Sequence, residues 1–282
     1  MKISVIIPTY NEEKDIEDCL KSLKFQSIKN IEIIIVDDGS TDNTIKIAEK
    51  YNIKILKQNH QGPGAARNLG AKNSKREILI FIDADMTFDK DYLKNLIKPI
   101  LKHKTKKIVG TTHDYEIATN TDNIWSALWG KIRVSKNSAK NVKIFRAIRK
   151  DKFLELGGFD PKYGYADDQT FWFKYEIKPV VAENTICYHK NPESLKETYK
   201  QARWIGASWK ERYFIFRIPL VNYFSVLVLC IFLPWIVLLK SLKIKLGENK
   251  ISLKNIIKFY WVKFRGYFEG IKKAVIKGEV WK

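Results

Sequence analysis

The chain has 282 residues, 45% of them hydrophobic, so it can bury one good core and is not a disordered tail. Its formal net charge of +20 favours an anionic partner, either nucleic acid or anionic lipid. The three cysteines are far apart and odd in number, which fits a reducing compartment better than a disulfide framework.

The first hundred residues alternate strand-like and helix-like stretches. Apolar runs predict buried strands at residues 3–7, 31–36 and 78–82, and residues 53–56 are strand-like. Helical patterns occupy residues 11–25, with Asn11 as the expected cap, and residues 41–51, 65–73 and 92–101. Strands alternating with helices predict right-handed crossovers and an α/β fold with a mainly parallel sheet flanked by helices.

Polar clusters follow three of these strands, at residues 8–11, 37–40 and 83–85. In such sheets ligands bind beyond the carboxyl ends of the strands. Asp83 and Asp85 stand two residues apart where a strand ends, so together they can hold one divalent cation that bridges a diphosphate. A solvated turn is the alternative interpretation of this triplet alone.

Two further segments can contact a nucleotide. Asp38 can accept hydrogen bonds from a base or a ribose hydroxyl, although a simple turn before a helix would look the same. Gly64 and Arg67 belong to a glycine-rich turn that leads into a helix, where backbone N–H groups and a guanidinium can meet phosphate or ribose oxygens. The turn is neither a Walker loop nor a dinucleotide-binding fingerprint.

Four ordered blocks within about 85 residues carry a resemblance to a known family. They read SVIIPTYNE at residues 4–12, VDDGSTD at 36–42, GAARNLG at 64–70 and FIDAD at 81–85, and GGFD follows at 157–160. Together they resemble the family 2 inverting glycosyltransferases of the GT-A fold, over roughly residues 1–210. The resemblance implies a Rossmann-like nucleotide-sugar domain.

The resemblance also implies roles for individual residues. Asp38 would hold the nucleobase, Asp83 would face the ribose, and Asp85 would bind the metal, usually Mn²⁺ or Mg²⁺. Asp83 is also a candidate metal ligand, and His189 lies where some GT-A enzymes place a third one, although a lone histidine is more often structural. The remaining expected nucleotide-sugar contacts are Pro8, Thr9, Tyr10, Glu12, Gly64, Arg67 and Ala84.

The candidate catalytic residues are Asp167 and Asp168, which stand where the family usually carries Glu-Asp. We assign the general base to Asp168 and the orientation of the acceptor to Asp167. Without the resemblance, two acids at a helix N-terminus would explain the pair equally well. Arg203 lies in a sequence, Gln-Ala-Arg-Trp, that partly resembles an element of processive synthases, and it can pair with the diphosphate.

Residues 218–239 are almost uninterrupted apolar sequence, long enough as one helix to cross a bilayer core of about 30 Å. Residues from 240 onward carry a net +9, and a stripe that includes Ile256, Tyr260 and Phe264 predicts a basic amphipathic helix for the membrane interface. A spanning segment, a re-entrant segment and a buried core helix remain open. The tail helix can also dock on the protein domain.

These observations predict a nucleotide-sugar-binding half at residues 1–110, an acceptor and catalytic half at 111–212 and a membrane-associating part at 213–282. The expected activity is transfer of a sugar from a nucleoside diphosphate to a polyprenyl-linked or glycolipid acceptor at an anionic membrane surface. The apolar run before Pro8 is too short for a signal peptide, so the catalytic domain is expected on the cytoplasmic face of the cell membrane. A non-catalytic membrane scaffold and a nucleotidyltransferase are the alternatives, and nucleic acid is not an expected partner.

Overall fold

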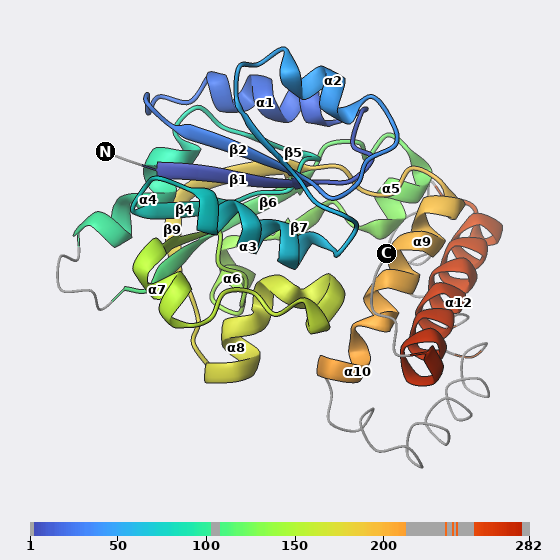
Figure 1. Cartoon of the computed structure of the whole chain (residues 1–282). Coiled ribbons are helices and arrows are strands. Elements are labelled where there is room, and N and C mark those ends of the chain that lie inside the picture. Colours follow the sequence, from blue (N-terminus) through green and yellow to red (C-terminus); the bar gives the residue numbers. More distant parts are fainter. Residues whose placement is uncertain are drawn as a thin grey trace. The chain divides into compact units, whose positions relative to one another are not determined.

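The computed structural model describes residues 3–102, 108–212 and 251–277, together with positions 235, 239 and 241 (Figure 1). Its contacts divide the chain into two compact units. The first comprises Met1–Thr119, Ile132–Pro161 and Asp167–Lys190, and the second comprises Asn120–Lys131, Lys162–Ala166 and Asn191–Lys282. The boundaries predicted after residues 110 and 212 divide the chain by binding role, whereas the two units divide it by contacts. The predicted division therefore stays a prediction.

Among the described residues, nine strands form one sheet in the first unit, in the order β3-β2-β1-β4-β8-β6-β9-β5, with β7 paired to β6. Their bounds are β1 Ile3–Thr9, β2 Glu32–Asp37, β3 Lys54–Lys57, β4 Ile78–Phe81, β5 Met86–Phe88, β6 Gly110–Ala118, β7 Ile132–Val134, β8 Ala147–Arg149 and β9 Val180–His189.

The sheet is mixed, so the prediction of a mainly parallel sheet is wrong for its second half. Strands β3, β2, β1 and β4 run parallel, as the helical crossovers between them require. Beyond β4 the pairs β4–β8, β8–β6, β6–β7 and β9–β5 are antiparallel, and only β6–β9 is parallel. The alternation of strand and helix that predicted a parallel sheet applies only to the first hundred residues.

The helices of the first unit cover both faces of the sheet. They are α1 Ile16–Lys24, α2 Thr44–Glu49, α3 Pro63–Asn73, α4 Tyr92–Lys102, α6 Lys136–Ala139, α7 Lys150–Glu155 and α8 Thr170–Tyr175. The 3₁₀ segment η1, Pro161–Gln169, has residues in both units, since Lys162–Ala166 belong to the second. Figure 1 shows α1 and α2 on one side of the parallel strands and α3 on the other.

Strand β1 separates the two cores because its side chains alternate between the faces of the sheet. Val5 and Ile7 belong to the core that includes α1, α2 and α4, whereas Ile6 belongs to the core that includes α3, α7 and α8. All three side chains are fully buried. A strand that is buried on both faces holds its carboxyl end in a fixed place, which is where the polar clusters lie.

The predicted elements of the parallel half are confirmed, with one correction at the start of α1. Asn11 is not its cap, because α1 begins only at Ile16 and Asn11 adopts a left-handed conformation with φ of 58°. Its side chain instead accepts a 2.8 Å hydrogen bond from the backbone of Thr41, which ties the β1–α1 loop to the β2–α2 loop.

The second unit contains α5 Ile124–Trp129, α9 Leu195–Ala207, α10 Trp209–Arg212 and α12 Leu253–Lys277. The predicted amphipathic tail helix is therefore a helix, and it packs closely on α9. Glycines make this approach possible, because a Cβ on Gly206 would lie 2.2 Å from the backbone oxygen of Tyr267, and one on Gly270 only 1.9 Å from that of Arg203. Ile256 and Ile271 of the predicted stripe are buried, while Ile257 and Trp261 stay exposed.

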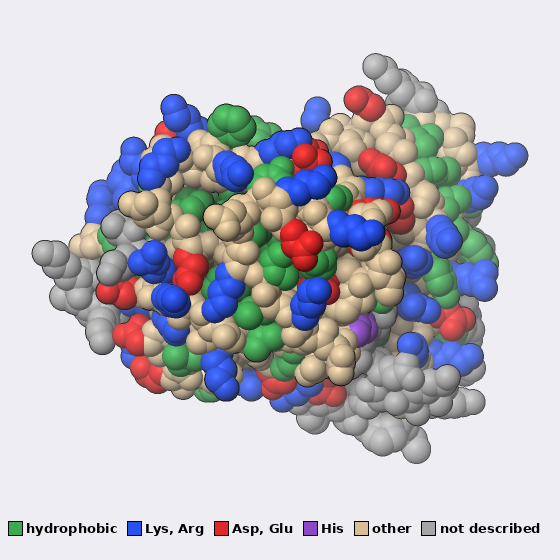
Figure 2. All heavy atoms as spheres, turned by 45° about the horizontal axis from the view of Figure 1, so that its top comes forward, with side chains coloured by type: hydrophobic (Ala, Val, Ile, Leu, Met, Phe, Trp, Pro, Cys, Tyr) green, Lys and Arg blue, Asp and Glu red, His purple; other side chains and the backbone are tan. Residues whose placement is uncertain are grey.

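The predicted apolar segment at residues 218–239 lies outside the described residues, apart from positions 235 and 239. Within the described part of the chain, no helix has the length and apolar character that crossing a membrane requires. On the face shown in Figure 2, Lys and Arg side chains are interspersed with Asp and Glu rather than gathered in one patch.

Candidate active site

Asp38 lies directly after β2 and is almost fully buried, with 2% of its surface exposed. Its carboxylate holds the loop that follows β3, accepting hydrogen bonds from the Gln61 backbone at 2.8 Å, the Gly62 backbone at 2.9 Å and the Gln58 side chain at 2.7 Å. His60 Nδ1 lies 2.9 Å from the same carboxylate. Asp38 thus builds the wall of the site, and its contact with a nucleobase stays a prediction.

The predicted nucleotide-binding residues of the first loop continue from β1. Pro8 and Thr9 end the strand, and the Tyr10 ring packs against His60 with 4.3 Å between ring centroids. Glu12 donates its backbone N–H to the Thr44 hydroxyl at 2.8 Å. The Tyr10–His60 contact thus joins this loop to the segment that Asp38 holds, and nucleotide binding by these residues stays a prediction.

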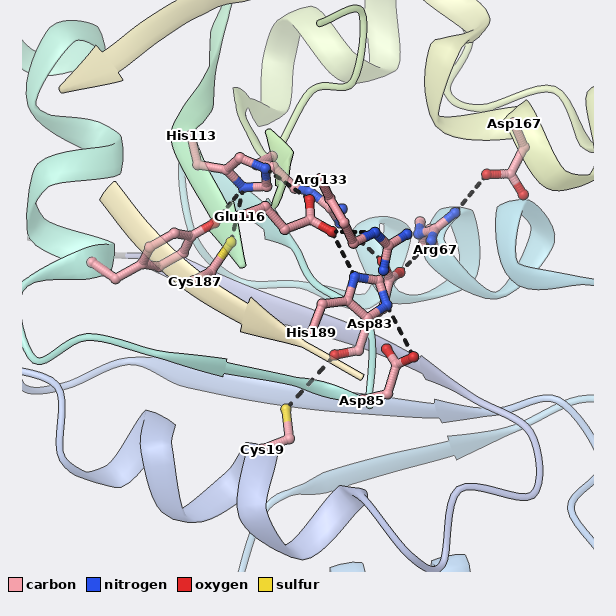
Figure 3. Close-up of polar contacts among 12 residues, drawn as sticks. Cys19, Arg67, Asp83, Asp85, His113, Glu116, Arg133, Asp167, Cys187 and His189 are labelled. Atoms are coloured by element: carbon pink, nitrogen blue, oxygen red, sulfur yellow. Dashed lines mark hydrogen bonds and ion pairs between the residues drawn. The ribbon is translucent and has the colours of Figure 1, made fainter. Parts of the chain in front are cut away.

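Asp83 follows the end of β4, and its carboxylate contacts two arginines, of which Figure 3 labels Arg67. One carboxylate oxygen accepts from Arg67 at 2.6 Å and the other from Arg146 at 3.1 Å. Burial opposes ionisation, but Arg146 and Arg67 hold the pKa of Asp83 well below its usual range. Because both oxygens face guanidinium groups, Asp83 is less open to a cation than Asp85.

Arg67 connects Asp83 to the predicted catalytic pair. The guanidinium is buried and donates to Asp167 at 2.5 Å through Nη1 while Nη2 contacts Asp83. Helix α3 can bring it there because Gly64 has no side chain: a Cβ at this position would lie 2.8 Å from Asp167 Oδ2 and 3.0 Å from Asp167 Cβ. This close contact explains why a glycine stands one helical turn before the arginine.

Asp167 is fully buried, and the Thr170 hydroxyl fixes its backbone by donating to the Asp167 carbonyl at 2.6 Å. Burial raises the pKa of Asp167 to about 7, with Arg67 opposing the shift and Asp168 adding to it. Asp168 follows in η1, half-buried, as the next residue of the chain. The two acids therefore share one electrostatic environment, in which a carboxyl group can exchange a proton near neutral pH.

Asp85 and His189 face each other across the β5–β9 pair. Met86 is the strand partner of His189, which brings His189 Nε2 to 3.0 Å from Asp85 Oδ2. The other ring nitrogen lies 2.7 Å from Glu116 Oε1. Burial favours the neutral ring, but Asp85 raises the pKa of His189 to about 9, so the free protein holds an imidazolium between two carboxylates.

The pair Asp85–His189 fits a divalent cation. A carboxylate oxygen and an imidazole nitrogen 3.0 Å apart are common metal-ligand types, and a cation can take the place of the proton between them. Two protein ligands leave coordination positions for phosphate oxygens and water, as is usual for cations that bind nucleotides. Divalent cation binding therefore fits Asp85 and His189 better than it fits Asp83.

The structure brings most of the predicted site residues together in the first unit, where Asp83, Arg67 and Asp167 are directly linked and Asp85 meets His189. Ala84 is buried between the two aspartates of its triplet. Arg203 lies on α9 in the second unit, and its predicted contact with the diphosphate stays a prediction.

Sequence reasoning missed several residues that build the site. Arg146 precedes β8 and gives no local signal, because its partner Asp83 is 63 residues away. Glu116 was detectable in principle. It follows His113 and Asp114 in a strand whose side chains are mostly buried, and charged residues in such a strand are rarely placed there without partners.

The fold and the acidic cluster define the class of α/β domains that hold a ligand beyond the carboxyl ends of their parallel strands. The family described as glycosyl transferase family 2 matches residues 4–155, more than half of the chain. The chain belongs to this family. The GT-A resemblance of the four sequence blocks is thereby confirmed at the level of the family.

Two bacterial relatives match part of the chain. Glycosyltransferase GlyA of Streptococcus pneumoniae is 36% identical over 119 residues, which is 40% of this chain and 17% of GlyA. The poly(ribitol-phosphate) beta-N-acetylglucosaminyltransferase TarS of Staphylococcus aureus is 42% identical over 111 residues, 36% of this chain and 19% of TarS. The matched stretch thus spans less than a fifth of either relative.

Two solved structures share the fold over nearly the whole chain. Residues 1–349 of S. aureus TarS in complex with UDP-GlcNAc align with a TM-score of 0.52 at 20% identity, covering 99% of this chain and 93% of that one. The mannosyltransferase PcManGT from Pyrobaculum calidifontis, in complex with GDP-Man and Mn²⁺, aligns with a TM-score of 0.60 at 19% identity, covering 98% and 87%. At this level of identity the likeness concerns the fold alone.

Proposed function

We propose that this chain is an inverting glycosyltransferase that moves one sugar from a nucleoside diphosphate donor to an acceptor hydroxyl or phosphate, with a divalent cation held by Asp85 and His189. The observation that carries the proposal is the Asp83–Arg67–Asp167 chain, whose links measure 2.6 and 2.5 Å. It connects Asp83, on the predicted ribose side of the site, to the predicted catalytic pair Asp167 and Asp168. The ligands of the two aligned structures, UDP-GlcNAc and GDP-Man with Mn²⁺, support the donor class and the cation.

Each residue has a distinct task in this proposal. Asp168 takes the proton of the acceptor hydroxyl as its oxygen attacks the anomeric carbon. Asp167 and Arg67 hold Asp168 and Asp83 in fixed positions, so that acceptor and donor approach each other in line. Asp85 and His189 bind the cation, which when present neutralises the charge of the departing nucleoside diphosphate.

Nucleotide binding tests the donor side of the proposal. Isothermal titration of the full chain with UDP and with GDP, each with and without Mn²⁺, should show cation-dependent binding of at least one of them. Asp85→Asn and His189→Gln should lose this dependence, whereas Asp18→Asn, at an exposed position of α1, should keep it. Equal binding with and without Mn²⁺ in the parent protein would exclude the cation from the donor site.

The pH dependence of the reaction should report on the acid pair. Because the pKa of Asp167 is raised to about 7, we expect kcat/KM to rise with pH through a limb near pH 7, where Asp167 loses its proton. Asp167→Asn should remove this limb, since the carboxyl group that titrates there is gone. A rate profile between pH 5 and 9 checks this, and a limb that remains in the variant would assign the titration to another group.

The acceptor we propose is lipid-linked, reached from an anionic membrane surface on the cytoplasmic side. The support is the apolar composition of residues 218–239, the basic tail, and the exposed side chains Ile257 and Trp261 on α12. Trp261 is 48% exposed, although α12 packs its glycine face against α9. Deleting α12 would uncover α9, so substitutions on the exposed face make the cleaner test.

Flotation with liposomes tests the membrane part. The full chain should float with vesicles that contain phosphatidylglycerol, less with phosphatidylcholine alone, and less again when Ile257 and Trp261 are both replaced by serine. Tyr175→Ser, which removes an exposed aromatic ring from α8 in the other unit, is the matched control. No flotation of the parent protein with either lipid would favour a soluble acceptor.

A further inference from the structure

We propose that Glu116 is the positioning residue of the cation site, which fixes the His189 ring so that Nε2, and not Nδ1, faces Asp85. This inference rests on the cation proposed above for Asp85 and His189. It concerns a residue two strands away from Asp85 in the sheet, on β6, that the sequence motifs do not include.

The backbone alone does not orient the ring. Pairing of β5 with β9 sets His189 opposite Met86, next to Asp85, but an imidazole can turn about its side-chain bonds and present either nitrogen. Strand β6 runs parallel to β9, with Glu116 opposite Cys187 and Ala118 opposite His189. Because side chains alternate along strands, Glu116 and His189 lie diagonally on the same face of the sheet.

The contact between the two side chains is short and buried. Glu116 Oε1 lies 2.7 Å from His189 Nδ1, and Glu116 has 4% of its surface exposed. A carboxylate can only accept, so Nδ1 must carry a proton, and Nε2 is the nitrogen left to bind a cation together with Asp85. Metal-binding histidines commonly donate their other N–H to such a carboxylate, which fixes the ring and strengthens the ligand.

Glu116 is itself held in place from two other sides. Arg133 on β7 donates through Nε to Glu116 Oε1 at 3.0 Å, and His113 Nε2 lies 3.1 Å from Oε2. Figure 3 shows the three side chains converging on Glu116. A carboxylate with three surrounding donors cannot swing away from His189 without leaving charged groups unpaired in the interior.

The neighbouring trio His113, Glu116 and Cys187 is a different arrangement, and the proposed cation site includes neither His113 nor Cys187. Its ligand atoms lie within 4.8 Å of one another. However, Cys187 Sγ contacts His113 Nδ1 at 3.4 Å, whereas Glu116 lies at His113 Nε2, on the other edge of the same ring. In this structure the three side chains form a buried chain of polar contacts behind Glu116.

The test measures Mn²⁺ affinity rather than transfer. Electron paramagnetic resonance of free Mn²⁺, with UDP or GDP present, should show about a 10- to 100-fold weaker affinity in Glu116→Leu than in the parent. Glu116→Gln should fall between them, because an amide oxygen still accepts from Nδ1. The matched control is Asp114→Asn on the same strand. Asp114 is also buried, but it accepts from Asn184 and Thr185 rather than His189, so this variant should keep the parent affinity.

A second readout follows the proton itself. The chain has four histidines, so ¹⁵N-histidine labelling gives few signals, and His189→Gln identifies the one that matters. With Mg²⁺ and nucleotide, His189 should carry its proton on Nδ1 in the parent and a mixture of both forms in Glu116→Leu. A purely structural role for Glu116 would lower stability and leave this pattern unchanged.

The outcomes separate the two proposals. If Asp85→Asn and His189→Gln bind Mn²⁺ as the parent does, or if the parent binds none, the proposed cation site is wrong and this inference falls with it. If those two variants lose Mn²⁺ while Glu116→Leu keeps both the affinity and the Nδ1 proton, the cation site stands and the role of Glu116 is refuted.

Discussion

Replacing Asp168 by asparagine is expected to lower the transfer rate about 10²- to 10⁴-fold while the affinity for the donor nucleotide stays the same, because a positioned general base contributes on that order. The substitution preserves shape and removes the group that would accept the proton of the acceptor hydroxyl. Steady-state kinetics, with a donor and an acceptor that the parent protein uses, measure the transfer rate. Nucleotide titration of the same sample measures the affinity.

Two variants make this expectation specific. Asp18→Asn removes an exposed carboxylate on α1 and should leave the rate unchanged. Asp167→Asn should retain more activity than Asp168→Asn, since Asp167 already pairs with Arg67 and acts by holding its neighbour. Normal turnover in Asp168→Asn, or a greater loss in Asp167→Asn, would transfer the base role away from Asp168.

Replacing Arg67 by methionine is expected to lower the free energy of unfolding by about 3–5 kcal/mol, because it leaves the carboxylates of Asp83 and Asp167 without a shared buried cation. Asp83 keeps Arg146, so most of the cost falls on Asp167. Urea unfolding followed by circular dichroism measures the change. Lys72→Met, which removes an exposed cation from the same helix, should change it little.

The loss in the Arg67 variant should also depend on pH. A carboxyl group whose pKa is raised on folding binds its proton more tightly in the native state, so it stabilises the fold less as pH rises from about 4 toward 7. Without Arg67 this effect grows, and the deficit should be greater at pH 8 than at pH 5. A deficit that does not vary with pH would mean that Asp167 stays ionised regardless of its partner.

The parallel half of the fold was predictable because its signals are local. Each apolar run that is buried on both faces, such as the run in β1, is long enough to stand out, and a helical pattern separates it from the next. The polar residues after these strands, including Asp38 and Asp83, could be placed at one edge of the sheet from topology alone.

The antiparallel half was not predictable in the same way. Strands β5, β7 and β8 have three residues each, too few to show a period, and they are strands because partners distant in the chain pair with them. Asn11 was expected to cap a helix, but its hydrogen bond to the second loop takes precedence over its local preference. Nothing in the sequence around Asn11 indicates that Thr41 would lie beside it in the fold.

The residues of the candidate site also differ in whether local sequence could predict them. Asp85, Asp167 and Asp168 stood out because motif positions carry them, whereas Arg146 and Glu116 became visible only as neighbours in space. From the residues alone either Asp83 or Asp85 could hold a cation, and the family resemblance assigned the ribose to Asp83 and the metal to Asp85. The structure distinguishes them, since two arginines surround one and a histidine faces the other.

The most direct test of the central claim is sugar transfer itself. The full chain would be incubated with a panel of labelled UDP- and GDP-sugars and a membrane lipid extract, with and without Mn²⁺, beside the Asp168→Asn variant. We expect label from one donor to enter the lipid fraction, and to be absent without the cation or in the variant. Failure of the parent protein to bind any of these nucleotides or to release sugar from any donor would contradict the assignment as a glycosyltransferase.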